Sequence, residues 1–339
     1  MKNFFRNSSL ILFAVMSLSL MAMGCSAKKS GSTAGEDDAL NNATKLVIGH
    51  NLNYFPIIVA YEKGFFKDEF GDTLKIEIPQ FANGPAQNEA VKAGRLDIAN
   101  VGDLPTIQLW ASDADIQVIS YLWDAPDGYS LVANKKSGIK TLADLKGKKI
   151  AVQFGSNYHK LVLKFLASQG LDANDAELVN LQRSESIIAI KQGVVDATTL
   201  PEPALSKTLS EDSNIVEICT SRGYDNIFIV AFVRTEYAKK NPQIVSRYLK
   251  VIKRANDWIA KNIDEATNIV IEFMGSNADD FEGTKKYLED RTWLVAVDQD
   301  LIDRLDDTIK FCREYELITR DDLDAKNLVN AAYVKEAGL

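Results

Sequence analysis

The sequence predicts an α/β fold of two similar lobes, and an internal repeat is the main reason. KLVIGHNLNYFPIIVAYEKG, from Lys45, resembles KKIAVQFGSNYHKLVLKFLASQG, from Lys148. EAVKAGRLDIANVGDLP, from Glu89, resembles IAIKQGVVDATTLPEP, from Ile188. In each copy strands alternate with helices, the pattern of mostly parallel sheets flanked by helices. Two copies are too few for a solenoid, so they predict two lobes with a cleft between them.

The alternation of strand and helix assigns the elements of each lobe in order. In the first lobe we expect strands near 46–50, 74–78 and 97–101, and helices near 55–63, 86–93 and 105–111. In the second lobe we expect strands near 149–153, 177–181 and 196–199, and helices near 158–169, 184–192 and 203–209. The apolar segments IQVISYLW and YSLVAN lie between these two sets, with the turn DAPDG separating them.

The C-terminal third predicts a strand that returns to the first lobe, followed by helices. NIFIVAFV, from Asn226, is a continuous apolar run, and Pro242 then opens a long amphipathic helix. Further helices are expected near 264–274, 283–292, 298–315 and 321–336. The chain would cross between lobes near Asn134–Lys136 and near Tyr224–Asn226, and two such strands form a hinge. Lobe 1 would comprise residues 45–134 and 226–339, and lobe 2 residues 135–225.

The N-terminus has the profile of an export signal. A basic start, MKNFFRN, precedes an apolar stretch that is too short for a membrane span. LMAMGC resembles the lipobox of bacterial lipoproteins, although Ala22 stands where Leu is usual. We therefore expect a lipoprotein signal peptide over 1–24, a lipid on Cys25 and a flexible polar tether over 25–44. In the alternative, cleavage is ordinary and Cys25 has no special role.

Composition argues against several classes of function. The net charge is −8, and no basic stretch with interleaved aromatic residues appears, which argues against nucleic acid as a partner. The two histidines, His50 and His159, are too few for a typical zinc site. Cys219 and Cys312 are expected to be buried free thiols, and no catalytic motif is present. We expect no metal, no cofactor and no enzymatic activity.

The predicted site lies beyond the carboxyl ends of the strands, where loops enter helices. Several of these helices have an early proline, at Pro56, Pro85, Pro105 and Pro203. The free N–H groups and dipole of a helix N-terminus attract an anion or a carbonyl oxygen. Their convergence from both lobes predicts a cleft that binds a small molecule.

The motifs VGDLP, DLKGKKIAVQFGSNYHKLVLKFLASQGL and GVVDATTLPEP resemble the periplasmic binding proteins of aliphatic-sulfonate, taurine and nitrate ABC importers. The resemblance extends from about Lys45 to Ala337. It implies the type II periplasmic binding protein fold and delivery of a small solute to an ABC permease and its ATPase. The family motif maps onto Gly102, Asp103, Gly155, Ser156, Asn157, His159 and the turn Leu200–Pro203. This turn reads LPEP where sulfonate binders often have an aromatic residue before Asp-Pro, so the chain departs from the family there.

The resemblance and the loop positions together define the candidate site. The candidate ligand-binding residues are Asn53, Tyr54, Phe55, Gly84, Gly102, Asp103, Trp123, Gly155, Ser156, Asn157, Tyr158, His159, Arg183, Glu202 and Tyr224. Arg183 could hold a sulfonate or carboxylate through two hydrogen bonds. Acidic loops suggest that the ligand also carries an amine or a protonatable ring. We expect a monomeric, membrane-anchored, solute-binding lipoprotein. The alternatives are a binder of thiamine-precursor pyrimidines or other nitrogen heterocycles, and an exported enzyme like the pyrimidine synthases, whose Cys-rich motif is lacking.

Overall fold

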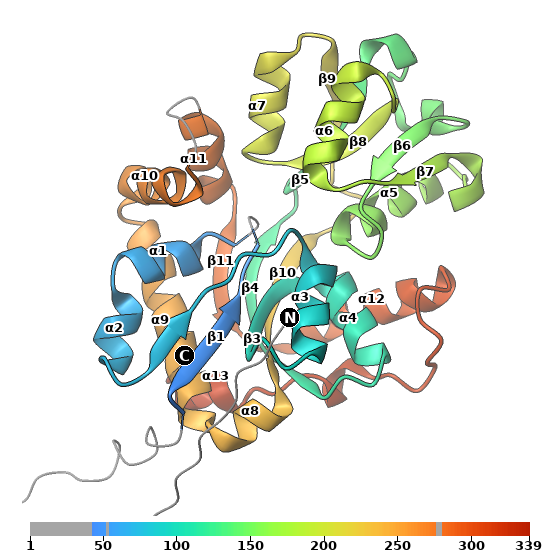
Figure 1. Cartoon of the computed structure of the whole chain (residues 1–339). Coiled ribbons are helices and arrows are strands. Elements are labelled where there is room, and N and C mark those ends of the chain that lie inside the picture. Colours follow the sequence, from blue (N-terminus) through green and yellow to red (C-terminus); the bar gives the residue numbers. More distant parts are fainter. Residues whose placement is uncertain (1–42, 52–53, 276–279) are drawn as a thin grey trace, which may run out of the picture. The chain divides into compact units, whose positions relative to one another are not determined.

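The computed structural model describes residues 43–51, 54–275 and 280–339. The predicted signal peptide, Cys25 and the tether as far as residue 42 lie outside the described residues, as does Asn53. The described chain contains two sheets, each flanked by helices (Figure 1). Among these residues, no helix is long and apolar enough to cross a membrane. The predicted α/β fold class is confirmed.

The first sheet has the strand order β11-β4-β10-β3-β1-β2. Its strands are β1 (Lys45–Gly49), β2 (Lys75–Glu77), β3 (Ile98–Gly102), β4 (Ile116–Ala125), β10 (Ile227–Arg234) and β11 (Thr292–Ala296). Its helices are α1 (Pro56–Glu62), α2 (Phe65–Phe70), α3 (Gly84–Lys92), α4 (Asp103–Ala111), α8 (Thr235–Lys240), α9 (Pro242–Ile259), α10 (Ile263–Met274), α11 (Phe281–Glu289), α12 (Gln299–Glu314) and α13 (Ala332–Glu336). One apolar cluster joins the sheet to α1, α2 and α9, and another joins it to α3, α4 and α12. This sheet and its helices form the first lobe.

The second sheet has the order β7-β6-β8-β5-β9. Its strands are β5 (Tyr129–Asn134), β6 (Lys149–Val152), β7 (Glu177–Asn180), β8 (Ala197–Pro201) and β9 (Ile215–Thr220), and its helices are α5 (Asn157–Ala167), α6 (Arg183–Gln192) and α7 (Ala204–Glu211). The order β7-β6-β8 repeats the order β2-β1-β3 of the first sheet, with parallel pairing in both. The remaining pairs, which involve the strands on either side of the two crossings, are antiparallel. Both sheets are therefore mixed, and the expectation that they are mostly parallel is wrong.

The repeated aspartates have the same structural role in both lobes. The carboxylate of Asp97 accepts a hydrogen bond from the backbone N–H of Val47 at 2.9 Å. Asp196 accepts one from the backbone N–H of Lys149 at 2.8 Å. In each case an aspartate directly before one strand, β3 or β8, accepts from the backbone of the parallel strand beside it, β1 or β6. The sequence repeat at these positions therefore reflects a shared fold.

One predicted crossing point is wrong and the other agrees with the strand order. We expected Tyr129–Asn134 at the end of the first lobe, but β5 pairs with β8 and β9 of the second sheet. The chain therefore leaves the first sheet between Ala125 and Tyr129 rather than near Asn134–Lys136. Every residue of β5 is buried, so its composition carried no signal about which sheet it joins. The second crossing lies between Thr220 and Ile227, which includes the predicted segment.

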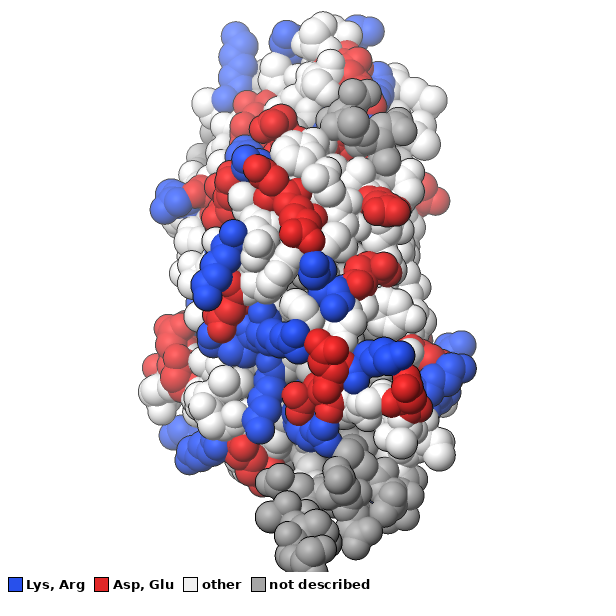
Figure 2. Space-filling model, turned by 90° about the vertical axis from the view of Figure 1, so that its left-hand side faces the viewer, with Lys and Arg blue, Asp and Glu red and all other residues white. Residues whose placement is uncertain are grey.

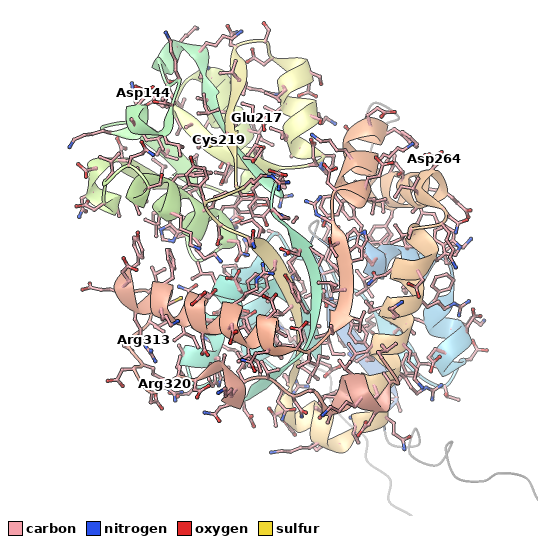
Figure 3. All side chains as sticks on the ribbon, turned by 180° about the vertical axis from the view of Figure 1, so that it is seen from behind. Asp144, Glu217, Cys219, Asp264, Arg313 and Arg320 are labelled. Atoms are coloured by element: carbon pink, nitrogen blue, oxygen red, sulfur yellow. The ribbon has the colours of Figure 1, made fainter. Side chains whose placement is uncertain are left out.

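Two predicted C-terminal helices also differ from the structure. The helix expected over 283–292 ends at Glu289, and the TWLVA segment that follows is strand β11. The helix expected over 321–336 is only a 3₁₀ turn, Ala325–Asn327, and α13. Arg313, at the end of α12, donates to the carbonyl oxygens of Asp321 at 2.7 Å and Leu323 at 3.1 Å (Figure 3). These bonds stabilise an irregular path that a continuous helix could not follow.

Candidate functional site

A cavity with a volume of about 20 Å³ lies between the loops of the two lobes. The first lobe contributes the loop after β1, the start of α3 and the start of α4; the second contributes the loop between β6 and α5 and the start of α6. The lining residues are Asn51, Ala82, Asn83, Gly84, Gly102, Pro105, Tyr129, Gln153, Ser156, Asn157, Tyr158, Arg183 and Ile229. This space suits little more than one water molecule, because the walls already contact one another.

Four helix N-termini open onto this cavity, those of α3, α4, α5 and α6. At the start of α3, Asn83 caps the helix by accepting from the backbone N–H of Ala86 at 2.7 Å. Its amide nitrogen donates across the lobes to Oε1 of Gln182 at 2.9 Å, which also accepts from Gln153 at 2.6 Å. The first N–H groups of a helix lack intrahelical partners and carry the positive end of its dipole. Such termini from two lobes favour an anionic group between them.

Tyr158, Tyr129 and Arg183 form one wall of the cavity. The rings of Tyr129 and Tyr158 are stacked with their centroids 4.5 Å apart. The guanidinium of Arg183 donates to the Tyr158 hydroxyl at 2.6 Å and lies 5.5 Å from the ring centroid. Among the described residues, Arg183 is the one cationic side chain that lines this cavity. The wall therefore combines a flat aromatic surface with a positive charge suited to sulfonate or carboxylate oxygens.

Beneath the cavity, a buried polar cluster joins the lobes through Asn157 and Asp103. The amide nitrogen of Asn157 donates to Oδ1 of Asp103 at 2.7 Å and to the carbonyl oxygen of Phe228 at 3.3 Å. Asp103 is fully buried; it forms a very short ion pair with Lys160 and accepts from the Thr308 hydroxyl at 2.5 Å.

Lys160 also contacts Asp225, in the segment that crosses between the sheets after β9. Its ammonium lies 3.1 Å from Asp225, which Lys164 also contacts at 2.6 Å. Burial alone would raise the pKa of Asp103, but the Lys160 ammonium outweighs it and holds that pKa below its usual value. Burial likewise opposes the charge of Lys160, yet Asp103 and Asp225 raise its pKa above the usual range. Both groups are therefore ionised at neutral pH.

Six of the predicted site residues line the cavity, and the prediction missed several others. The six are Gly84, Gly102, Ser156, Asn157, Tyr158 and Arg183. The missed residues are Asn51, Ala82, Asn83, Pro105, Tyr129, Gln153 and Ile229. Asn51, Asn83 and Gln153 lie within two residues of predicted positions. Asn83 also carries an N-cap signal directly before Gly84 and Pro85. Ile229 carried no signal of its own, because it lies on the return strand.

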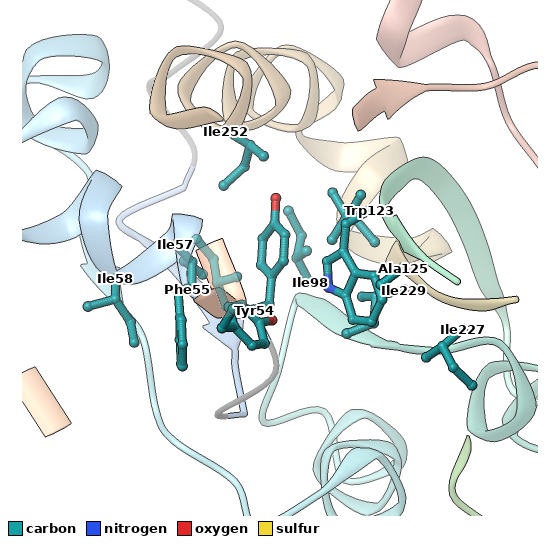
Figure 4. Close-up of a cluster of buried hydrophobic side chains, with 14 of the residues drawn as sticks. Tyr54, Phe55, Ile57, Ile58, Ile98, Trp123, Ala125, Ile227, Ile229 and Ile252 are labelled. Atoms are coloured by element: carbon teal, nitrogen blue, oxygen red, sulfur yellow. The ribbon is translucent and has the colours of Figure 1, made fainter. Parts of the chain in front are cut away.

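Tyr54, Phe55 and Trp123, which we expected to face the cleft, lie in the hydrophobic core of the first lobe. All three are fully buried, and none lines the cavity (Figure 4). The ring of Phe55 lies 4.3 Å from that of Tyr287, and Arg291 lies 5.1 Å from the ring of Trp123. The repeated Asn-Tyr pair therefore has different surroundings in the two lobes: Tyr158 reaches the cavity and Tyr54 does not.

Five further predicted residues lie near the cleft without lining the cavity. Asp103 lies beneath it, and Gly155 forms the turn before α5 with a φ of +72°, which favours glycine. His159 packs against Phe154, with ring centroids 4.9 Å apart. Glu202 binds Ser206 and Lys286, the latter on α11 of the first lobe, at 2.8 and 3.0 Å. Tyr224 lies in the second crossing, and its ring packs edge-on against Phe165 of α5.

A second and larger cavity, of about 360 Å³, lies between α5, the second crossing and α12. Its charged groups are largely compensated: Lys164 pairs with Asp225, and Arg304 pairs with Asp124 at 3.1 Å. Within the described part of the chain, no cluster of three or more His, Cys, Asp or Glu side chains could hold a metal ion. The smaller cavity is therefore the better candidate for recognition, because helix N-termini and Arg183 converge on it.

The chain is similar to known proteins in sequence and in fold. The chain is 29% identical over 329 residues to a Bacillus subtilis (strain 168) protein named as an aliphatic sulfonates-binding protein, with 96% of each chain covered. It is 27% identical over 231 residues to an Escherichia coli (strain K12) protein of the same name, covering 68% of this chain and 72% of that one. The fold matches the alkanesulfonate-binding protein from Xanthomonas axonopodis pv. citri bound to MOPS, with a TM-score of 0.78, 22% identity, and coverage of 85% of this chain and 98% of that one. The model of the family described as NMT1/THI5 like matches residues 51–266, and the chain belongs to this family.

Proposed function

We propose that this chain is the solute-binding component of an ABC importer and that it captures a small organic sulfonate between its lobes. The observation that carries the proposal is the cavity in which four helix N-termini and Arg183 converge from both lobes. The names of the sulfonate-binding relatives support the same ligand class.

In this proposal, the ligand acts by stabilising the closed arrangement of the lobes. Pockets that hold small molecules usually measure a few hundred Å³, so the cavity must widen before a sulfonate can enter. A ligand shifts the equilibrium between open and closed forms only by the difference in its affinity for them. We place lobe 1 at residues 45–125 and 227–339 and lobe 2 at 129–220, following the strand order. The permease would recognise the closed form.

The cellular setting follows from the same proposal. We propose that residues 1–24 direct export, that Cys25 carries a lipid, and that the monomeric protein presents its ligand to the permease and ATPase at the membrane. Acidic and basic side chains are intermixed on the face shown in Figure 2. Exposed pairs such as Arg254 with Asp68 and Lys253 with Asp257 likewise join opposite charges. This mixture gives no support for nucleic acid as a partner.

We further propose that the chain is not an enzyme. Burial raises the pKa of the Cys219 thiol to about 11, with a further contribution from Glu217 beside it (Figure 3). Burial raises the pKa of Cys312 to about 12. Both thiols are protonated at neutral pH and are therefore poor nucleophiles, which argues against covalent catalysis through cysteine.

The proposal is tested by titrating the purified protein with ethanesulfonate, taurine, nitrate and a thiamine-precursor pyrimidine. A sulfonate is expected to bind stoichiometrically, raise the melting temperature and reduce the radius of gyration in solution scattering. Release of an unchanged ligand would distinguish a binder from an enzyme. If only the pyrimidine binds, or if sulfonates bind without compaction, the proposal is wrong.

The contribution of Arg183 is tested by Arg183→Gln. Because charge-assisted hydrogen bonds contribute roughly 1.5–3 kcal/mol, the dissociation constant for the sulfonate should rise about 10- to 100-fold. Arg320→Gln is the matched control, since Arg320 pairs with Asp322 and does not line the cavity. An equal loss of affinity in both variants would contradict a direct role for Arg183.

A further inference from the structure

Arg291, between α11 and β11, is a buried cation with an unused pair of donors. It is 6% exposed, and its Nη1 donates to the carbonyl oxygen of Tyr287 at 2.8 Å. Its Cζ atom lies 3.4 Å from the ring centroid of Tyr287 and 5.1 Å from that of Trp123. Among the described residues, Nε and Nη2 of Arg291 have no hydrogen-bond partner. These two nitrogens form one edge of the guanidinium, and such an edge binds two oxygens of an oxyanion side by side.

The described residues do not compensate the charge of Arg291. Burial lowers its pKa, and the carboxylates of Asp290 and Glu202, which favour the charged form, do not offset that effect. Glu202 is itself engaged by Lys286 at 3.0 Å. A guanidinium stays charged in proteins, and a buried charge without a partner is unfavourable. An anion from outside the chain would therefore be stabilised at this edge.

Arg291 lies close to the boundary between the lobes. The helix before it, α11, packs against the turn that leads into α7 of the second lobe, where a Cβ on Gly283 would lie 3.0 Å from the Cβ of Pro203. Tyr129 of the second lobe lines the small cavity, and both Arg291 and Arg183 oppose the rise that burial causes in its pKa. The two cations therefore act on one tyrosine from different lobes. Because Arg183 lines the cavity and Arg291 does not, a single sulfonate at Arg183 is not expected to contact both.

We propose that Arg291 binds a second anionic group of the ligand, so that the solute is a sulfonate that also carries a carboxylate or a second sulfonate. This inference rests on the proposed function and narrows its ligand class to dianions. Arg183 holds the sulfonate at the cavity, and Nε and Nη2 of Arg291 hold the second oxyanion. Each lobe then contributes one charge-assisted contact, and only the closed form offers both to one ligand. Because α11 and α7 belong to different lobes, the opening that admits the ligand also parts these two helices.

The test compares sulfonates that share a carbon chain and differ in charge. Ethanesulfonate is paired with sulfoacetate, and propanesulfonate with 3-sulfopropanoate; the second member of each pair is a dianion at neutral pH. Isothermal titration at one fixed ionic strength should show that at least one dianion binds about tenfold or more tightly than its partner. Equal affinity within both pairs, or tighter binding of the monoanions, overturns the inference and leaves the proposed function standing. No binding of any of the four removes the proposed function and the inference with it.

Arg291→Met and Arg247→Met separate a ligand contact from a general effect of charge. Arg247 also lies over an aromatic ring, that of Phe70, but the Glu69 carboxylate compensates it at 2.8 Å. Arg291→Met should bring the ratio of dianion to monoanion affinities to near one, whereas Arg247→Met should keep the wild-type ratio. A ratio kept in Arg291→Met, or lost equally in both variants, overturns the inference.

Arg291→Lys provides the same test if Arg291→Met does not fold. Lysine keeps the positive charge but replaces the two-nitrogen edge by a single ammonium, which cannot form two parallel hydrogen bonds to one oxyanion. The affinity ratio should therefore fall below that of the wild-type protein. A wild-type ratio in Arg291→Lys overturns the assignment of the second oxyanion to Nε and Nη2.

Discussion

His50 shows how burial of a single residue couples stability to pH. It follows β1, is fully buried, and its ring lies edge-on to that of Phe273 with centroids 5.8 Å apart. Burial disfavours the charged imidazolium and lowers the pKa of His50 to about 4, from an ordinary value of 6.5. In the unfolded chain the same side chain is solvated and titrates near its ordinary value. The two states therefore bind different numbers of protons between these two values.

The free energy of unfolding should therefore fall as the pH decreases from 6.5 toward 4. Above pH 6.5 His50 is neutral in both states and does not lower the free energy of unfolding. Between pH 6.5 and 4 only the unfolded state takes up the proton, so stability is lost through this window. The total loss in the free energy of unfolding is at most about 3 kcal/mol. His50→Gln should flatten this slope in urea unfolding measured from pH 7.5 to 4.5. His159, whose pKa burial also lowers, acts in the same direction, so His159→Gln is measured beside it. An unchanged slope in His50→Gln would contradict this account.

At the scale of elements, local sequence patterns predicted most of the repeated strand-loop-helix units. They predicted little about the strands next to the crossings between the two sheets. The strand-loop-helix units and the glycine at the end of α6 follow from periodicity and composition alone. The sheet to which β5 belongs depends on pairing with distant strands, which no local pattern encodes. TWLVA is rich in residues that favour strands, but it lies between two expected helices, and its pairing with β4 makes it part of the first sheet.

The candidate site was predictable to the level of its loops but not of its side chains. The repeat placed the helix starts correctly, and six predicted residues line the cavity. Whether an aromatic residue at a helix start faces the cavity or the core depends on the elements packed beneath it. Tyr54 meets α9 and α11 of the first lobe, whereas Tyr158 meets Tyr129 and Arg183 at the cavity.

The contact between α4 and α5 gives a prediction at this scale. Gly102 has a φ of −66°, so alanine fits its backbone, but the added Cβ would overlap the Asn157 side chain. Gly102→Ala should therefore hold the lobes apart, weaken sulfonate binding by about tenfold or more, and leave the ligand-saturated protein less compact in solution scattering. Adding Asn157→Ala removes the overlapping atoms and should restore compaction. Full closure of Gly102→Ala alone would contradict the role assigned to this contact.

At the scale of the whole molecule, charges that join the lobes fall into two classes. Lys160 and Asp103 are both buried. Lys286 is 55% exposed on its side chain, and the Glu202 carboxylate that it contacts at 3.0 Å is buried but also accepts from the Ser206 hydroxyl. Exposed ion pairs contribute about 0–1 kcal/mol and are screened by salt. A buried pair that loses one partner leaves an uncompensated charge, which costs about 3–5 kcal/mol. Closure should therefore depend mainly on the buried pair and only weakly on salt.

Lys160→Met tests this division, with Lys286→Met as the control. The first variant leaves the Asp103 carboxylate buried without its cation, and because Lys160 lies on α5 and Asp103 on α4, separating the lobes lets water reach that charge. We therefore expect Lys160→Met to be more extended than the wild-type protein in solution scattering and to bind sulfonate more weakly. The double variant Asp103→Asn with Lys160→Met should recover part of the compaction, since no lone charge remains. Lys286→Met should change much less than Lys160→Met in both measurements, because the N–H and hydroxyl of Ser206 still donate to the Glu202 carboxylate. If the two lysine variants open to the same extent, or if neither opens, the buried pair does not hold the lobes together.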